Sequence, residues 1–340
     1  MKDLYQPFLG SAGICTDSRS LFPDCFFVAL KGENFDGNRF VKDALDRGCK
    51  FALTEDPSWK GHPKVGVVDD TLRTLQDLAR MHRLEKDPRV VALTGSNGKT
   101  TTKELTAAVL ATRYRVLAAP GNLNNHIGGA LTPPVVEGRG SGRSGDGGKP
   151  PRRDRLLASI AAPDLGLITN VGKAHLEGFG SPEGVLKAKS ELYAYLAAHD
   201  GTALVDGGDG PLLNRALELG ATVKRIGRDE DLFVEATLVR QQPFLELEVV
   251  LAGERHGLTT RLVGAYNLQN IKYALAIGLE FGVPSSAMLE AVSDYVPRNQ
   301  RSEYIRGNRN QIILDAYNAN PSSMREAIRS FLDYGRAPGC

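Results

Sequence analysis

The chain has 340 residues, of which 41% are hydrophobic and 24% are charged, and its formal net charge is +2. This length predicts two or three domains of roughly 100–200 residues each, and the composition excludes a globally disordered chain. No apolar run approaches the ~18 residues of a membrane span, and the first residues lack the layout of a signal peptide. Four cysteines, Cys15, Cys25, Cys49 and Cys340, show no metal-ligand spacing, so we expect free thiols in a cytoplasmic protein.

The predicted elements change character near Pro88. Before it, a strand at 25–30 and helices at 39–47 and 71–84 predict a small α/β unit. After it, apolar strands are expected at 90–93, 165–169, 202–205 and 222–226, separated by helices at 99–112, 182–198 and 211–218. This alternation predicts parallel βαβ units.

The rest of the chain departs from that alternation. Residues 232–263 alternate apolar and polar side chains, which predicts an antiparallel patch. Helices are expected at 267–281 and 285–293, followed by a strand at 311–315 and a helix at 321–332. The predicted fold class is therefore α/β, with a third domain beginning near residue 305.

The strongest local signal is an apolar strand that runs into a glycine loop and then a helix, VVALTGSNGKTT at 90–101. Backbone N–H groups in such a loop and at the helix N-terminus form a binding site for phosphate. Lys99 supplies a positive charge for the β- and γ-phosphates, and Thr100 offers a hydroxyl to Mg²⁺. Only two residues separate the glycines, so the loop is a short variant of the general pattern. It predicts a site for a nucleoside triphosphate.

Five further blocks accompany this loop. They are TDSR at 16–19, GNLNNHIG at 121–128, ITNVGKAHLEGFGS at 168–181, KAKSEL at 187–192, and GAYNLQN at 264–270 together with Arg301 and DAYNANP at 315–321. With the phosphate loop, they resemble the Mur ligase family of ATP-dependent amide-forming enzymes. DAYNANP and the block around His175 favour the branch of this family that adds D-alanyl-D-alanine.

The resemblance implies an ATP-dependent acid–amino-acid (peptide) ligase of peptidoglycan synthesis, a pathway of cell wall biogenesis, cell shape and cell division. The reaction would join D-alanyl-D-alanine to UDP-N-acetylmuramoyl-tripeptide through an acyl phosphate, with ATP and Mg²⁺ as cofactors. The expected partners are these two substrates, without nucleic acid, and the chain is expected to be a monomer. The implied domains are 1–86 for UDP-sugar binding, 87–304 for ATP binding, and 305–340 as the start of a C-terminal Rossmann-like ligase domain.

The resemblance also assigns site residues. The residues implied to bind the nucleotide are Gly95, Ser96, Asn97, Gly98, Lys99, Thr100, Thr101, Asn267, Asn270, Arg301 and Asp315. Those implied to bind the UDP-substrate are Ser18, Arg19, Asn122, Asn124 and Asn125. The catalytic group is Lys99, His175 and Lys189, and the metal ligands are Thr100, His175 and Lys189, the last as an Nζ-carbamate. A carbamate forms on a neutral amine, so Lys189 is expected to be partly buried.

For three of these blocks, interpretations without a ligand stay open. Asp17 and Arg19 could form only a local surface pair, residues 121–128 could be a turn without a ligand, and the run at 187–192 could be a solvated helix face. The amine substrate could also differ, as in MurE-type or folylpolyglutamate-type ligases.

Residues 138–155 are basic and of low complexity, GRGSGRSGDGGKPPRRDR. Composition alone suggests a flexible linker or an RNA-binding insert. The Mur ligase pattern instead requires an apolar strand and a metal-ligand glutamate, and codons compatible with Gly145–Asp154, read one base later, encode EMGANHPGE. We therefore interpret residues from about 133 to 155, within an aberrant segment 129–155, as out of frame. Such a segment cannot form a buried strand.

The chain also ends soon after the first strand and helix of the expected C-terminal domain, which we interpret as truncation. Together, these two features predict little or no ligase activity for this chain. The alternative is a non-catalytic remnant that only binds UDP-muramoyl-peptide or nucleotide.

Overall fold

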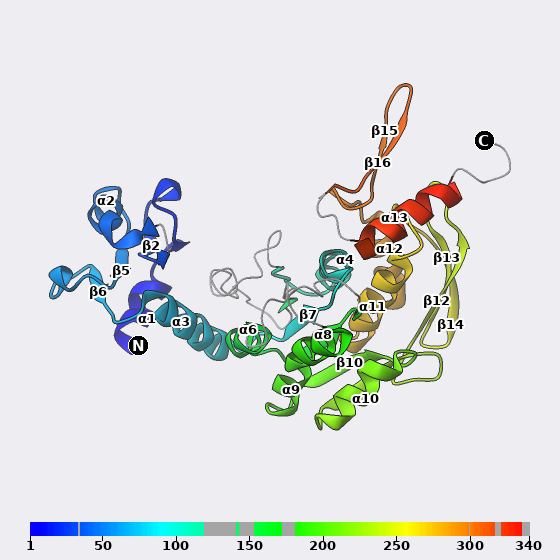
Figure 1. The fold of residues 1–340 in the computed structure, drawn as a ribbon, viewed down its shortest axis with the longest axis horizontal. Helices are drawn as coiled ribbons and strands as arrows, with labels where there is room; N and C mark the ends of the chain where they lie inside the picture. Colours follow the sequence, from blue (N-terminus) through cyan, green and yellow to red (C-terminus); the bar gives the residue numbers. More distant parts are fainter. Residues whose placement is uncertain are drawn as a thin grey trace. The chain divides into compact units, whose positions relative to one another are not determined.

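The computed structural model describes residues 1–32, 35–118, 141–142, 153–171, 181–298, 300–316 and 321–334 (Figure 1). Of 141–142, 153–155, 182, 321–323 and 333–334 it describes the backbone only. The described residues form two compact units, one from Met1 to Asp87 and the other from Pro88 to Tyr334. The mixed α/β class predicted from the sequence is confirmed. The three-domain division at 86 and 304 stays a prediction.

The first unit is built on a four-stranded parallel sheet in the order β1-β2-β5-β6. Its strands are β1 (Gly13–Cys15), β2 (Cys25–Val28), β5 (Phe51–Thr54) and β6 (Val65–Val67). The connecting segments contain a short hairpin of β3 (Lys31–Gly32) and β4 (Phe35–Asp36). They also contain three short 3-10 helices, η1 (Ser18–Ser20), η2 (Gly37–Phe40) and η3 (Pro57–Trp59). These helices are α1 (Lys2–Leu9), α2 (Val41–Asp46) and α3 (Thr71–Lys86).

Local sequence signals explain the boundaries of α3. The Asp70 carboxylate caps the helix by accepting a hydrogen bond of 2.8 Å from the Arg73 N–H. Leu75 and Leu78 lie fully buried on one face, as the spacing of apolar residues in an amphipathic helix requires. The helix ends at Asp87, whose φ of 42° is left-handed, so the chain turns just before Pro88.

The expectation of free thiols is wrong for two cysteines. Cys25 and Cys49 are joined by a disulfide, and their Cα atoms lie 4.7 Å apart. Cys25 opens β2, and Cys49 lies two residues before β5, the parallel neighbour of β2. Strand pairing therefore brings together two residues that are 24 positions apart, and sequence spacing does not reveal this. Cys15 is free and buried, and Cys340 lies outside the described residues.

The second unit contains an eight-stranded sheet in the order β14-β13-β12-β11-β10-β9-β7-β8. The parallel strands are β7 (Val90–Thr94), β8 (Ser141–Gly142), β9 (Leu165–Ile168), β10 (Thr202–Asp206) and β11 (Thr222–Gly227), and β12 (Leu232–Arg240) pairs in parallel with β11. Then β13 (Glu246–Leu251) and β14 (Glu254–Thr259) continue the sheet in antiparallel pairing. Both the parallel βαβ region and the antiparallel patch predicted from the sequence are confirmed.

The helices of this unit are α4 (Lys99–Ala111), α6 (Arg153–Ala161), α8 (Pro182–Lys189), α9 (Glu191–Ala197), α10 (Gly210–Glu218), α11 (Asn267–Glu280) and α12 (Ser285–Asp294). Helices α4 and α11 lie side by side, and their buried Leu105, Val109 and Ile271 share one core with the sheet (Figure 1). The single helix expected at 182–198 is instead two helices that meet at Ser190. The Ser190 hydroxyl donates to the Leu186 carbonyl at 2.6 Å, a local bond that competes with a continuous helix.

The segment interpreted as out of frame lies mostly outside the described residues. Its described parts are β8, which pairs with β7 at the edge of the sheet, and the start of α6. The burial of the β8 side chains is not described, so the expectation that this segment forms no buried strand stays a prediction.

The last described elements are a hairpin of β15 (Glu303–Arg306) and β16 (Gln311–Leu314) and the helix α13 (Pro321–Tyr334). Met324, Ile328, Phe331 and Leu332 of α13 are all exposed. Among the described helices, none combines the length and apolar character that crossing a membrane requires.

The buried Gly37 offers a test of the first unit. A Cβ at this position would lie 2.6 Å from the Leu30 carbonyl oxygen and 2.8 Å from the Ala29 carbonyl carbon, both backbone atoms that cannot rotate away. We expect Gly37→Ala to lower the free energy of unfolding by about 1–3 kcal/mol. The fluorescence of Trp59, the only tryptophan and part of the same unit, would report denaturant unfolding.

The matched control is Gly32→Ala in the neighbouring hairpin, where the nearest atom to a new Cβ is 4.0 Å away. Its effect should stay within about 0.5 kcal/mol. Equal stability of the two variants would show that the close approach at Gly37 is not a constraint.

Candidate nucleotide-binding site

The glycine loop lies at the carboxyl edge of the parallel sheet. It follows β7 and leads into α4, as the sequence predicted. The neighbouring strand β9 ends at the same edge, and Thr169 continues its ladder by donating its N–H to the Thr94 carbonyl at 2.8 Å. Ligands of α/β proteins bind at this edge.

Both glycines of the loop are required by geometry. Gly95 has a φ of 146° and Gly98 a φ of 81°, in the left-handed region that favours glycine. A Cβ on Gly95 would lie 2.0 Å from the Thr169 hydroxyl oxygen, and one on Gly98 would lie 2.3 Å from Asn270 Oδ1. The loop is therefore enclosed between the end of β9 and the first turns of α11.

Lys99 and Thr100 open α4 directly after the loop. Lys99 Nζ donates to the Gly95 carbonyl at 2.7 Å and to the Ser96 carbonyl at 3.1 Å, so the ammonium lies within the loop. Thr100 is buried beside it. The N-terminus of a helix carries partial positive charge, which adds to that of Lys99. This arrangement can hold an anionic group such as a phosphate.

Asn267 and Asn270 form a buried chain of carboxamides beside the loop. Thr102 Oγ1 donates to Asn270 Oδ1 at 3.1 Å, Asn270 Nδ2 donates to Asn267 Oδ1 at 2.8 Å, and Asn267 Nδ2 donates to the Val263 carbonyl at 2.9 Å. The structure thus joins both asparagines to α4. Their implied contact with the nucleotide stays a prediction.

Lys189 is the last residue of α8, and its side chain points toward β7, the strand that leads into the phosphate loop. Its side chain is only 2% exposed, and its Nζ donates to Thr94 Oγ1 at 3.4 Å. The alternative of a solvated helix face therefore does not apply to Lys189, whereas Lys187 on the same helix is exposed. Burial of this degree disfavours a charged amine.

Arg301 lies within electrostatic reach of both Asp315 and α4. Burial raises the pKa of the Asp315 carboxyl, and the charge of Arg301 opposes that rise. On α4, burial lowers the pKa of Lys103. The charge of Glu104 opposes this lowering, and the charge of Arg301 adds to it. The Tyr295 hydroxyl donates to the Glu104 carboxylate at 2.5 Å.

Sequence reasoning missed this polar cluster of Lys103, Glu104 and Tyr295. The available signal was local, because Lys103 follows Lys99 by about one helical turn and Glu104 is the next residue. Tyr295 becomes the neighbour of Glu104 only through the fold, since the two lie 191 residues apart along the chain.

Two predicted substrate residues lie in the other unit. Ser18 is buried, and its carbonyl accepts a hydrogen bond of 2.9 Å from Arg47. The Arg19 side chain is 87% exposed and donates twice to the Asp17 carboxylate, at 2.9 and 2.8 Å. The local surface pair is therefore present, and binding of a diphosphate by Arg19 stays a prediction.

The remaining predicted residues, Asn122, Asn124, Asn125 and His175, lie outside the described residues. Within the described part of the chain, no three or more His, Cys, Asp or Glu side chains gather as a metal site.

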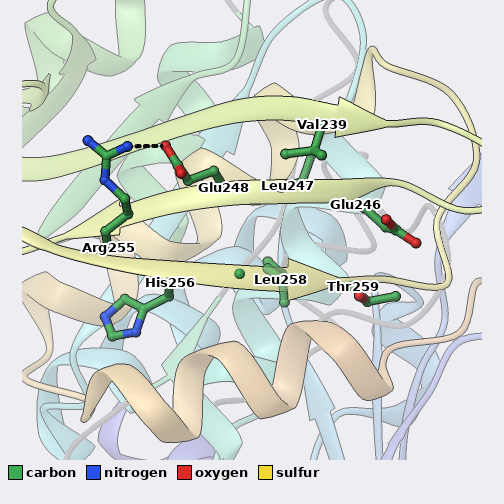
Figure 2. Close-up of a pocket in the computed structure, with 9 residues that line it drawn as sticks. Val239, Glu246, Leu247, Glu248, Arg255, His256, Leu258 and Thr259 are labelled. Atoms are coloured by element: carbon green, nitrogen blue, oxygen red, sulfur yellow. Dashed lines mark hydrogen bonds and ion pairs between the residues drawn. The ribbon is translucent and has the colours of Figure 1, made fainter.

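A separate hollow of about 470 Å³ lies on the antiparallel end of the sheet (Figure 2). Glu246, Glu248, Arg255 and Thr259 line it, and Figure 2 shows the Arg255 guanidinium directed at the Glu248 carboxylate. These two groups are paired at 2.8 Å, and Glu246 pairs with Arg240. The hollow contains no residue of the phosphate loop, so we do not assign the chemistry to it.

Comparison with known proteins agrees with this geometry. Residues 93–143 and 144–278 match the family profile described as the Mur ligase middle domain, and residues 11–83 match the Mur ligase family, catalytic domain. A UDP-N-acetylmuramoyl-tripeptide–D-alanyl-D-alanine ligase of Bacillus subtilis is 35% identical over 95% of this chain and 71% of its own length. The Escherichia coli ligase of the same name is 33% identical, over 93% of this chain and 71% of its own length.

Solved structures give the same result. MurF from Acinetobacter baumannii superposes with a TM-score of 0.84 at 29% identity, over 97% of this chain and 76% of that one. MurF from Thermotoga maritima, in complex with ADP, gives 0.84 at 25% identity, over 100% of this chain and 77% of that one. From the family profiles, the sequence relatives and these structures, we conclude that the chain belongs to the Mur ligase family, and the relatives named above are MurF ligases.

Proposed function

We propose that this chain is an ATP-dependent ligase of the MurF type, which adds D-alanyl-D-alanine to UDP-N-acetylmuramoyl-tripeptide in peptidoglycan precursor synthesis. The observation that carries the proposal is the phosphate loop, enclosed by Thr169 and Asn270, with Lys99 inside it. The identity to MurF ligases over nearly the whole chain supports the choice of substrates.

The nucleotide would lie with its phosphates at the N-terminus of α4. Gly95 to Thr101 would surround the phosphates, with Asn267, Asn270, Arg301 and Asp315 as the further nucleotide contacts. Anion binding by the loop follows from its backbone N–H groups and from the charge on Lys99.

The residues present fit Mg²⁺ in part. Thr100 offers a buried hydroxyl at the start of α4, and Lys189 lies buried beside Thr94, where a carbamate would add a carboxylate. Oxygen ligands of this kind suit Mg²⁺. His175 is the third proposed ligand. When bound, Mg²⁺ would neutralise charge on the phosphates.

The proposed reaction needs no covalent protein nucleophile. The γ-phosphoryl group passes to the terminal carboxylate of the tripeptide, and the amine of D-alanyl-D-alanine displaces phosphate from the resulting acyl phosphate. The protein contributes position and charge, through the loop and Lys99 on the nucleotide and through Ser18, Arg19, Asn122, Asn124 and Asn125 on the UDP-substrate.

We also propose that the chain acts in the cytoplasm, where ATP is available, as a monomer without a nucleic-acid partner. We also propose that residues 133–155 are out of frame; the two adjoining stretches of the family match, 93–143 and 144–278, meet inside this segment. Our proposal therefore includes a ligase activity of this chain that is lower than that of an intact MurF-type ligase.

A phosphate-release assay tests the function. We expect slow release that requires ATP, UDP-N-acetylmuramoyl-tripeptide and D-alanyl-D-alanine together. Lys99→Ala should reduce the rate about 100-fold or more, because it removes the charge within the phosphate loop. Binding of the UDP-substrate without any turnover would contradict the ligase and support a non-catalytic remnant. Turnover with another amine only would identify a sister ligase.

Carbamylation of Lys189 is tested by ¹³C NMR in ¹³C-bicarbonate. We expect a carbamate resonance in the unaltered protein, since the amine is buried. Lys189→Arg should abolish it, because a guanidinium does not form this carbamate. Lys187→Arg, on the exposed face of the same helix, should retain the resonance, and loss of the signal there would refute the assignment.

The Asp17–Arg19 pair predicts that the stability of the folded loop around it depends on pH. Hydrogen bonds from Arg19 lower the pKa of Asp17 from 3.8 to about 2. Because the folded value is the lower one, the pair favours the folded loop above pH 3.8 and loses this contribution as the pH falls toward 2. In Arg19→Met the Asp17 pKa, measured by carboxyl ¹³C NMR, should rise toward 3.8. Arg73→Met, an exposed control, should leave it unchanged.

A further inference from the structure

Asn170 holds both residues that separate the two glycines of the phosphate loop. Asn97 donates its N–H to Asn170 Oδ1 at 3.0 Å, and Asn170 Nδ2 donates back to the Asn97 carbonyl at 3.0 Å. Ser96 donates its N–H to the Asn170 carbonyl at 3.0 Å. One residue thus satisfies three backbone groups of the loop, at a distance of 73 residues along the chain from Asn97.

Thr169, the residue before Asn170, connects the loop contact to the buried core. The Thr169 hydroxyl donates to the Asn97 carbonyl at 2.6 Å, and the Thr169 carbonyl accepts a hydrogen bond of 3.0 Å from the Tyr273 hydroxyl. Thr169 and Tyr273 are both buried. The position of Asn170 is therefore fixed by β9 and by α11.

The bonds from Asn170 to Ser96 and Asn97 affect which N–H groups of the loop can donate to a phosphate. The N–H groups of Ser96 and Asn97 are directed at Asn170, so within the surrounding loop an anion would be bound by Gly98, the first turn of α4 and Lys99 rather than by these two N–H groups. The bonds within the loop segment run from Lys99 Nζ to the Gly95 and Ser96 carbonyls, and neither of them involves the N–H groups of Ser96 and Asn97 or the Asn97 carbonyl. Those backbone groups are bound from outside the segment, by Asn170 and, at the Asn97 carbonyl, also by the Thr169 hydroxyl.

We propose that Asn170 is a positioning residue, which sets the conformation of the phosphate loop and thereby the affinity for ATP. It acts through Asn97 and is not itself a catalytic residue. The ATP part of this inference rests on the proposed function, whereas the conformational part does not.

Hydrogen exchange and ATP binding, measured on the full chain, test both parts. In Asn170→Ala, exchange of the Ser96 and Asn97 amides should accelerate about tenfold or more, while exchange elsewhere in the second unit stays as it was. The Kd for ATP, measured by displacement of a fluorescent ATP analogue, should rise about tenfold or more. A purely structural role would accelerate exchange throughout the unit.

Asn170→Asp is the second variant, in case Asn170→Ala fails to fold. Its carboxylate still accepts from the Asn97 N–H but opposes the Asn97 carbonyl, so the Asn97 amide should remain protected while ATP affinity falls. Asn214→Asp makes the same charge change on the exposed face of α10 and should alter neither quantity.

Unchanged exchange at the loop in Asn170→Ala, or an ATP affinity within twofold of the original in both Asn170 variants, would overturn the inference. If the unaltered protein binds no ATP, the proposed function fails and so does the ATP part of the inference. The exchange measurement then still decides whether Asn170 holds the loop.

Discussion

The shape of the phosphate loop depends on two close approaches made by distant segments. The Thr169 hydroxyl occupies the space beside Gly95, and the Asn270 carboxamide occupies the space beside Gly98. A loop with two residues between its glycines cannot form such contacts from its own side chains. The site therefore exists only once β9 has paired with β7 and α11 has packed against α4.

This dependence makes the hydrophobic core part of the site. Leu93 of β7, Leu105 of α4 and Ile271 of α11 belong to one buried cluster, so the elements that contact the loop share one packed interior. Close-packed interiors transmit small changes in volume. A substitution in this cluster would consequently alter the distances at Gly95 and Gly98 as well as the stability of the unit.

The sequence predicted the elements and the type of strand pairing, and missed particular side-chain contacts between segments that lie far apart in the chain. The strand, loop and helix from Val90 to Ala111 were predictable, because apolar residues, glycines and the helix start follow one another directly. Burial of Lys189 was inferred from a resemblance and is present in the structure. The disulfide of Cys25 and Cys49 was missed, since parallel pairing of β2 and β5 creates it.

Asn170 and Tyr295 were missed for a related reason. Asn170 binds backbone atoms, which any residue type presents, so no complementary side chain marks its partner in the sequence. Tyr295 contacts Glu104 across 191 residues. The available signal for Asn170 was its place directly after an apolar strand, where the carboxyl edge of the sheet lies.

The hydrogen-bond capacity of Asn267 and Asn270 is compatible with both their contacts beside the loop and the nucleotide contacts proposed for them. A carboxamide has two N–H donors and two acceptor lone pairs. Among the described residues, Asn270 uses one N–H toward Asn267 and one lone pair toward Thr102, and Asn267 uses one N–H toward Val263. Each side chain thus retains the capacity for a second N–H bond. A nucleotide acceptor at that position would add a bond without breaking the chain that holds α11 against α4, so support of the loop and contact with the ligand are compatible in the same two residues.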